Sequence, residues 1–165
     1  MSARLAAKRL APGDTRGVLR LWLRLLSTTN LIEQRVRSGL RDRFQSTLPR
    51  FDLLAQLDHA PQGLTMGELS RRMMVTSGNV TGLAARLIRE GLVERRVDAA
   101  DRRSATLRLT AQGRRAFGQM APVHAGWIAE VFQGLNAGER DQLAALLGQV
   151  KQLLAPNEMA QGRME

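Results

Sequence analysis

Apolar positions in the first third of the chain recur at steps of three and four residues, the period of a helix that buries one face. The positions that keep this step are Val18, Leu21, Leu25, Thr29, Ile32, Val36, Leu40 and Phe44. They predict a helix from Asp14 to about Phe44, roughly 45 Å long at 1.5 Å per residue. Because this length exceeds the width of a small domain, we expect part of the helix to pack on a second chain.

Start and stop signals delimit two shorter helices after it. Pro49 begins the segment RFDLLAQLDHA, and Pro61 closes it. Thr65 is followed three residues later by Glu68, which is the spacing of a capping box, so a short helix is predicted to start there.

The segment GNVTGLAARLIREG predicts a further helix, separated from the short one by a tight turn. Thr76 or Ser77 can cap its start, and Gly91 is the glycine expected after its end. Short helix, tight turn and helix make the helix-turn-helix arrangement. On a helical wheel the expected core face holds Val80, Leu83, Ala84, Leu87 and Ile88. The outward face holds Asn79, Thr81, Gly82, Ala85, Arg86 and Arg89.

The outward face of this helix is small and hydrogen-bonding near its N-terminus, which suits a close approach to base edges in the major groove of DNA. The free N–H groups at a helix N-terminus also suit a phosphate. An ordinary amphipathic surface helix would show the same pattern, and it stays open as an alternative.

Two runs that alternate apolar and polar residues, LVERRV and ATLRLT, predict a β-hairpin. The loop between them, Asp98 to Ser104, is longer than the roughly two to five residues of most hairpin loops. Arg102 and Arg103 at its tip have no core to pack on, and a narrow minor groove attracts inserted arginine. We therefore expect them to enter a groove of DNA, with Asp98 and Asp101 holding them by ion pairs. A solvated hairpin is the alternative.

Two helices are predicted to follow the hairpin. The first runs from Thr110 to about Gln133, and Pro122 should kink it. The second begins at Asn136, which forms another capping box with Glu139. Its apolar stripe holds Leu143, Leu146, Leu147, Val150, Leu153 and Leu154. Two-fold association would bury this stripe and that of the first long helix; folding of both onto their own chain is the alternative.

The charge of the chain is strongly positive. Its 165 residues carry 25 Lys and Arg against 15 Asp and Glu, a net charge of +10, and nearly all the cations are arginine. Nine of the 25 basic residues lie in 61–110. Such a balance favours an anionic partner: nucleic acid, an anionic membrane surface or a phosphorylated ligand. An arginine-rich soluble protein without such a partner is the alternative.

Catalysis is not expected from this sequence. The chain has no cysteine and no tyrosine, and its two histidines, His59 and His124, lie far apart. It lacks a glycine-rich nucleotide loop and any clustered metal-type spacing. We therefore expect no catalytic residues, no metal and no cofactor.

No apolar run approaches the roughly 20 residues of a membrane span. The start, MSARLAAKRLAPGD, is basic but lacks the long apolar core of a signal peptide. We therefore expect a cytoplasmic protein without a membrane partner. The competing class is a basic protein that associates with nucleic acid or membranes without sequence preference.

The stretch ELSRRMMVTSGNVTGLAARLIREGLVERRVDAADRRSATLRLTAQG resembles the winged helix-turn-helix core of MarR-type transcriptional regulators. The order of the helices also matches, so the resemblance covers about 14–155. The family wing often reads Asp-x-Arg-Asp-x-Arg; Asp98, Asp101 and Arg103 match, whereas Ala100 stands where the first arginine would be. The resemblance implies a homodimer, a near-palindromic double-stranded DNA operator, and repression relieved by a small ligand.

The expected fold is mainly α-helical with a small β-hairpin wing: a winged helix-turn-helix lobe plus a helical dimerisation region. We assign 1–13 to a flexible basic arm, 14–46 and 110–155 to dimerisation, 47–109 to the DNA-binding lobe and 156–165 to a flexible tail. The residues expected at DNA are Thr65, Thr76, Ser77, Gly78, Asn79, Thr81, Gly82, Arg86, Arg89, Asp101, Arg102 and Arg103.

In the resembled family the effector pocket lies between the dimerisation helices and the DNA-binding lobe. Residues that could line it here are Trp22, Arg35, Arg37, Phe51, His124 and Trp127. The expected effector is a small aromatic carboxylate, or an acyl-coenzyme A thioester whose phosphates would engage the arginines. The aromatic residues could instead be core or dimer contacts, and the arginines could be solvated.

Overall fold

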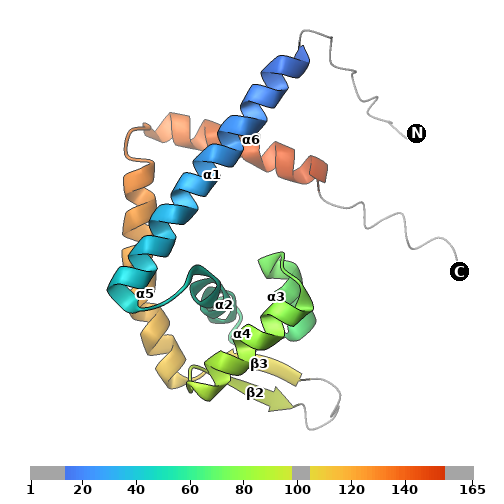
Figure 1. Cartoon of the computed structure of the whole chain (residues 1–165), viewed down its shortest axis with the longest axis vertical. Coiled ribbons are helices and arrows are strands. Elements are labelled where there is room, and N and C mark those ends of the chain that lie inside the picture. Colours follow the sequence, from blue (N-terminus) through green and yellow to red (C-terminus); the bar gives the residue numbers. More distant parts are fainter. Residues whose placement is uncertain (1–13, 98–104, 155–165) are drawn as a thin grey trace, which may run out of the picture. The chain divides into compact units, whose positions relative to one another are not determined.

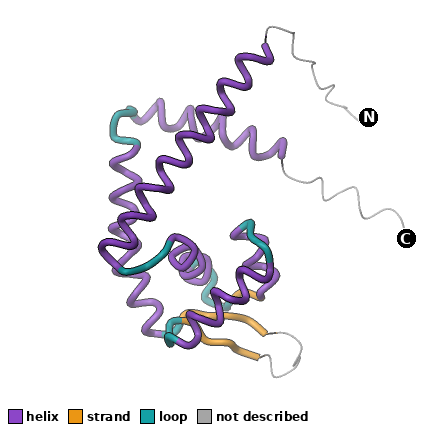
Figure 2. Tube along the Cα trace, viewed as in Figure 1, coloured by secondary structure: helices purple, strands orange, loops and turns teal. Residues whose placement is uncertain are grey.

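The computed structural model describes residues 14–97 and 105–154, and this part of the chain is mainly helical with a small sheet (Figures 1 and 2). The elements are α1 (Asp14–Phe44), α2 (Leu48–Asp58), β1 (Leu64–Thr65), α3 (Met66–Met73), α4 (Ser77–Arg89), β2 (Val93–Val97), β3 (Ala105–Leu109), α5 (Ala111–Val131) and α6 (Ala137–Leu154). The expectation of a mainly α fold with a β wing is confirmed. The chain divides into two compact units, of which the first ends at Gly126 and the second begins at Trp127.

The helix boundaries follow the sequence signals closely. The long first helix has the predicted ends, Asp14 and Phe44. The capping box at the start of α3 is present: Glu68 N–H donates to the Thr65 hydroxyl at 3.3 Å, and Thr65 N–H donates to the Glu68 carboxylate at 2.7 Å. Gly91 follows Glu90, the C-cap of α4, and has a φ of +72°, a conformation that glycine adopts without strain.

The sheet has three antiparallel strands in the order β1-β3-β2, so the expectation of a two-stranded hairpin was incomplete. Leu64 pairs with Leu107, and Thr65 pairs with Thr106. Gly63 makes this pairing possible. Its φ is +91°, and a Cβ there would lie 2.8 Å from the Leu107 carbonyl oxygen. The strand of two residues completes the sheet on the side away from β2.

The core of the N-terminal unit is built around α2, which lies among α3, α4 and the sheet in Figure 1. The largest fully buried side chains are Leu40, Leu53, Leu54, Leu57, Leu69, Val80, Leu87 and Val93. Burial of branched aliphatic side chains stabilises each by roughly 1.5–3 kcal/mol relative to exposure. This core fixes the orientation of α4 and of the sheet, which carry the candidate site.

The predicted core face of α4 is partly wrong. Val80, Ala84 and Leu87 are buried as expected, but Leu83 is half-buried and Ile88 is 37% exposed. Ile88 is exposed because it lines a groove of about 680 Å³ between α4 and the sheet, together with residues of β2 and β3. In the last turn of α4, Leu87 therefore packs in the interior, whereas Ile88 lies beside the open groove.

The C-terminal unit holds the last residues of α5 and the whole of α6. Its capping box is present: Glu139 N–H donates to Asn136 Oδ1 at 3.0 Å, and Asn136 N–H donates to the Glu139 carboxylate at 2.8 Å. No residue of α6 is buried. Helix α5 continues past Pro122 to Val131, so this proline does not end it.

Candidate nucleic-acid interface

The turn between α3 and α4 is short and tightly held. Met74 caps α3 in the left-handed conformation, with φ 54°, and Val75 N–H donates to Ser70 O at 3.2 Å. Thr76 is extended, so it serves as the N-cap of α4, although its side chain makes no capping hydrogen bond. Because Leu69 and Val80 on either side of the turn are fully buried, the two helices are fixed against each other.

The outward face of α4 is exposed along its length. The exposed residues that the sequence assigned to DNA are Thr76, Ser77, Gly78, Asn79, Thr81, Gly82, Arg86 and Arg89. A Cβ placed at Gly78 or at Gly82 would meet nothing within 4 Å. These two glycines therefore leave open space on the surface, and a duplex could approach the backbone of α4 closely there.

The hydroxyl groups of Thr81 and Thr65, both predicted to contact DNA, already have partners. The Thr81 hydroxyl donates to Ser77 O at 2.8 Å, one turn earlier in the same helix. The Thr65 hydroxyl donates to the Glu68 carboxylate at 2.8 Å, and Thr65 is only partly exposed. Asn79, whose amide offers both a donor and an acceptor, is therefore the best placed side chain on α4 to read a base edge.

Arg95 was not predicted from the sequence as a DNA contact. It lies on the side of the sheet that faces α4. It is exposed and lines the same groove as Thr81 and Ala85. The alternating pattern of β2 could have indicated the position of Arg95, because this residue lies between Val93 and Val97 on one face of the strand. Arg95 places a guanidinium beside α4.

An ion pair fixes the end of α4. The Arg50 guanidinium in α2 holds both carboxylate oxygens of Glu90, with 2.7 Å between Nη1 and Oε1. The hydrogen bond with Arg50 is the main reason why the pKa of Glu90 lies below its usual value, and it raises the pKa of Arg50. The buried Arg50 Nε has no partner among the described residues, so the guanidinium depends on Glu90.

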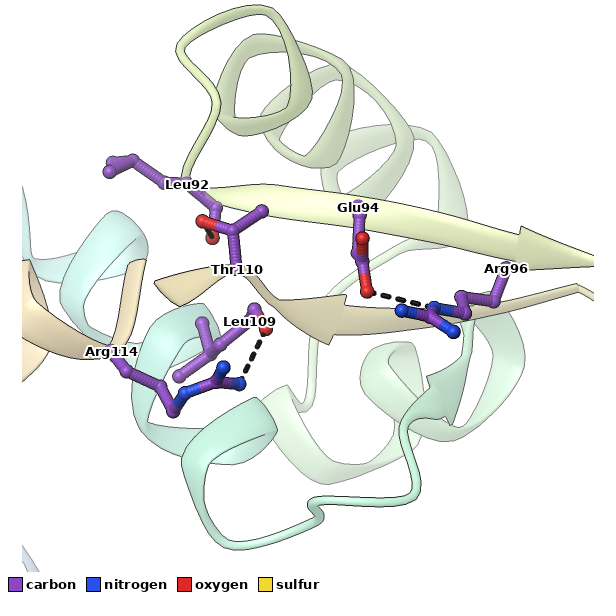
Figure 3. Close-up of polar contacts among 6 residues, drawn as sticks. All are labelled: Leu92, Glu94, Arg96, Leu109, Thr110 and Arg114. Carbon is purple, nitrogen blue, oxygen red and sulfur yellow. Dashed lines mark hydrogen bonds and ion pairs between the residues drawn. The ribbon is translucent and has the colours of Figure 1, made fainter. Parts of the chain in front are cut away.

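Hydrogen bonds around Thr110, which follows β3, close the base of the wing. Figure 3 shows Thr110 and Leu92 at this base. The Thr110 hydroxyl donates to Gly91 O at 2.6 Å and accepts from Gly113 N–H at 3.0 Å. Its N–H donates to Leu92 O at 3.1 Å. The two ends of the hairpin are thereby joined to each other and to the first turn of α5.

The wing tip lies outside the described residues. The predictions for Asp98, Asp101, Arg102 and Arg103 fall there, so they stay predictions. The register Val97 with Ala105 shows where the two strands of the wing leave the sheet.

The structure brings together some of the predicted effector residues. The Phe51 and His124 rings lie 4.4 Å apart between centroids, and burial lowers the pKa of His124. Arg37 forms an ion pair with Glu33 at 2.8 Å. Trp22 is 56% exposed, and Arg35 is also exposed. Trp127 is half-buried and belongs to the C-terminal unit.

A carboxyl group that the sequence did not single out lies near Arg37. Asp52 of α2 has its pKa raised, first by burial and then by the nearby Glu33 carboxylate, whereas Arg37 acts in the opposite direction. The side chain of Asp52 is half-buried. Helices α1 and α2 thus share a small charged cluster.

None of the helices in 14–97 and 105–154 combines the length and the apolar character that a membrane crossing needs. Within the same ranges, histidine and acidic side chains do not gather in groups of three or more that could hold a metal ion.

Comparison with known proteins gives a consistent result. Residues 45–104 match the model of the MarR family. The chain is 32% identical over 142 residues to an HTH-type transcriptional regulator of Bacillus cereus, covering 86% of this chain and 93% of that protein. It is 31% identical over 103 residues to the HTH-type transcriptional repressor YetL of Bacillus subtilis, covering 62% of each. The crystal structure of a MarR family transcriptional regulator from Silicibacter pomeroyi is similar, with a TM-score of 0.71 and 32% identity over 86% of this chain and 97% of that one.

Proposed function

Because this chain belongs to the MarR family of winged helix-turn-helix transcriptional regulators, we propose that it binds a near-palindromic DNA operator as a homodimer and represses transcription until a small effector releases it. The observation that carries the proposal is the outward face of α4. That face offers the amide of Asn79, the open positions at Gly78 and Gly82, and Arg86 one to two turns further along. It combines room for close approach with groups for bases and phosphates.

The DNA-reading lobe in this proposal is 47–109, with Arg95 added to the predicted contacts. It acts from two sides: α4 in the major groove and the wing in the adjacent minor groove. Such a regulator works in the cytoplasm, where its operator lies.

Exposed apolar side chains support a dimer made through 14–46 and 110–155. In the N-terminal half of α1 they are Val18, Leu19, Leu21, Trp22, Leu23 and Leu26. In α6 they are Leu146, Leu147, Val150, Leu153 and Leu154. Burial of apolar surface contributes about 25 cal/mol per Å², so a second copy of the chain that covers these side chains would be stabilised. A two-fold axis would also set two α4 helices about 34 Å apart, one turn of DNA.

Release by an effector is supported by the contact between the tilted rings of Phe51 and His124, which joins α2 to α5. A small aromatic carboxylate, or an aromatic acyl-coenzyme A thioester, would suit these rings together with the arginines of α1. Repression is supported by the relative from Bacillus subtilis, which is named a repressor.

The test is selection of a preferred duplex from a random library, followed by footprinting. A near-palindrome of about 15–25 base pairs should be protected, as two half-sites one turn apart require. Light scattering of the same complex should give two chains per duplex. Equal affinity for the selected and a scrambled duplex would overturn the proposal in favour of a basic protein without sequence preference.

A further inference from the structure

The outer face of the wing sheet lines a cavity of about 480 Å³ that has no part in the proposed DNA or effector contacts. Its walls come from β2 and β3, from the C-terminal end of α2 and from the first turn of α5. We call it the wing pocket. Figure 3 shows Glu94, Arg96, Leu109, Thr110 and Arg114 among its residues.

The strand register explains why charged side chains gather there. Successive residues of a strand point to opposite faces, so Glu94 and Arg96 share the face that Arg95 does not. Glu94 pairs across the ladder with Arg108 of β3, which brings the second strand's arginine to the same face. Arg114 is added from α5, one turn after the wing base.

The guanidinium groups of the wing pocket are only partly engaged. Arg96 pairs with Glu94 at 2.8 Å, and Arg114 donates one N–H to the Leu109 carbonyl at 2.9 Å (Figure 3). The Nε of Arg108 is buried and has no hydrogen-bond partner among the described residues. A buried donor without a partner costs free energy, and a bound acceptor would remove that cost.

The charge and shape of the pocket define what would fit. Its three guanidinium groups, Arg96, Arg108 and Arg114, face the carboxylates of Asp58 and Glu94, which leaves one positive charge. Beside the charged groups the exposed apolar surface comes from Pro61, since Leu57 and Leu109 in the same wall are only 2% and 4% exposed. A cavity of this size lies in the range of small-molecule sites, roughly 300–1,000 Å³.

From these features we propose that the wing pocket binds a small organic monoanion, a carboxylate on an apolar ring, with Arg108 and Arg114 as its anchors. A carboxylate accepts from an arginine fork through two parallel hydrogen bonds, and a single negative charge matches the surplus of the pocket. The bound ring would lie against Pro61. The ligand would contact the strands of the wing, α2 and α5. It would therefore hold these three parts together.

The probe for this proposal is 4-fluorobenzoate, followed by fluorine NMR with the full chain in the absence of DNA. Saturable binding is expected below about 50 mM. The neutral analogue 4-fluorobenzamide should bind at least about tenfold more weakly, since hydrogen bonds to charged groups are the stronger ones. The readout needs no operator, so failure here leaves the proposed regulation of transcription unaffected, and the reverse also holds.

Two neighbouring arginines give a matched pair of variants. Arg114→Gln should weaken 4-fluorobenzoate binding about tenfold or more. Arg115→Gln, at the next position of α5, exposed and not in the pocket wall, should bind as the parent does. Arg108→Gln should repeat the effect of Arg114→Gln, with the melting temperature as a control of folding.

A gain of affinity provides a test that misfolding cannot imitate. Glu94→Gln removes one of the two carboxylates and frees Arg96, so 4-fluorobenzoate should bind a few-fold more tightly. The proposal is overturned if no saturable binding is seen, if the amide binds as well as the carboxylate, or if Arg114→Gln, Arg115→Gln and Glu94→Gln all bind like the parent. Loss of binding only on changes at Phe51 or His124 would place the probe in the other site and would also overturn it.

Discussion

Arg50 in the first turn of α2 and Glu90 at the end of α4 hold each other through a two-pronged ion pair, although 40 positions separate them in sequence. The arginine side chain is 24% exposed and the glutamate 43%, so the pair is partly shielded from water. The ion pair attaches the C-terminal end of α4 to α2, the helix at the centre of the core. The pair therefore helps to set the angle at which α4 is presented.

We first predict that Arg50 and Glu90 stabilise the fold jointly. A double-mutant cycle with Arg50→Gln and Glu90→Gln should give a coupling free energy of about 1 kcal/mol, because the pair is bidentate and partly shielded. The exposed pair Glu33–Arg37 is a matched control and should give roughly 0.3–0.5 kcal/mol. Chemical denaturation measures both, and equal coupling for the two pairs would contradict the prediction.

The second prediction separates base contacts from phosphate contacts on α4. Asn79→Ala should reduce discrimination between the operator and a mismatched duplex, by on the order of 1–3 kcal/mol for a lost base contact. Arg86→Ala should weaken binding to both duplexes alike and lower the slope of log affinity against log salt by about 1. Salt titrations of both variants on both duplexes give the answer. Intact discrimination in Asn79→Ala would show that another face of α4 reads the bases.

The third prediction concerns the wing tip. Arg103→Ala should strongly reduce operator affinity with an unchanged melting temperature, and the loss should be greatest where the wing covers A·T-rich DNA with a narrow minor groove. Arg102→Ala should cost less if this side chain reaches only the backbone. Asp101→Ala should reproduce part of the Arg103→Ala defect if the aspartate orients that arginine. Operator titration and circular dichroism melts measure these effects, and an Arg103→Ala protein that binds like the parent would show a solvated hairpin.

The fourth prediction is a pH dependence of stability that comes from His124. Burial lowers its pKa in the folded chain, so the unfolded chain binds the proton more readily. The stabilising contribution is therefore present above the ordinary histidine pKa near 6.5 and is lost as the pH falls through the folded value. His124→Gln should flatten the fall in unfolding free energy between about pH 7 and 5, by less than about 1 kcal/mol because the burial is partial.

The other histidine of the chain provides the control for this measurement. His59 is exposed after the end of α2, so His59→Gln provides a histidine substitution at the surface for comparison. The same dependence in His124→Gln and in the parent would refute the assignment.

The fifth prediction tests the closed base of the wing. A Cβ at Gly113 would lie 2.0 Å from the Leu92 carbonyl oxygen, so Gly113→Ala must displace backbone and should cost at least about 2–3 kcal/mol. Gly118, further along α5, is exposed with nothing within 4 Å of an added Cβ. Gly118→Ala should instead stabilise by up to about 1 kcal/mol through helix propensity. Thermal melts of the two variants should therefore shift in opposite directions.

The elements with a strong local signal were predictable from the sequence. The capping boxes at Thr65 and Asn136 and the glycine at Gly91 set helix ends where they were expected, since each acts within one turn. Strand β1 was missed because Leu64 and Thr65 are too few to show alternation, and only the partner strand makes them extended. Ile88 was assigned to the core because a helical wheel cannot show that the neighbouring surface is hollow.

The charged contacts that complete the site depend on the tertiary fold. The pairing of Arg50 with Glu90 joins segments distant in sequence, and neither residue stands out in its own helix. Arg95 was recognisable only as one polar position among Val93 and Val97 until the sheet placed it beside α4. The residues of α4 itself were named correctly as exposed because the periodicity of one amphipathic helix suffices for that.

Thr65 belongs at once to the sheet of the wing and to the start of the helix-turn-helix: it pairs with Thr106 in β3, and it caps α3. The wing and the helix-turn-helix, which would contact neighbouring grooves, are therefore joined through one residue. Neither can change its orientation independently of the other. A duplex whose groove spacing differs from the distance built into the lobe would satisfy one part only by bending toward the other. The affinity of this protein for DNA would thus depend on the width and pitch of the double helix as well as on its base sequence.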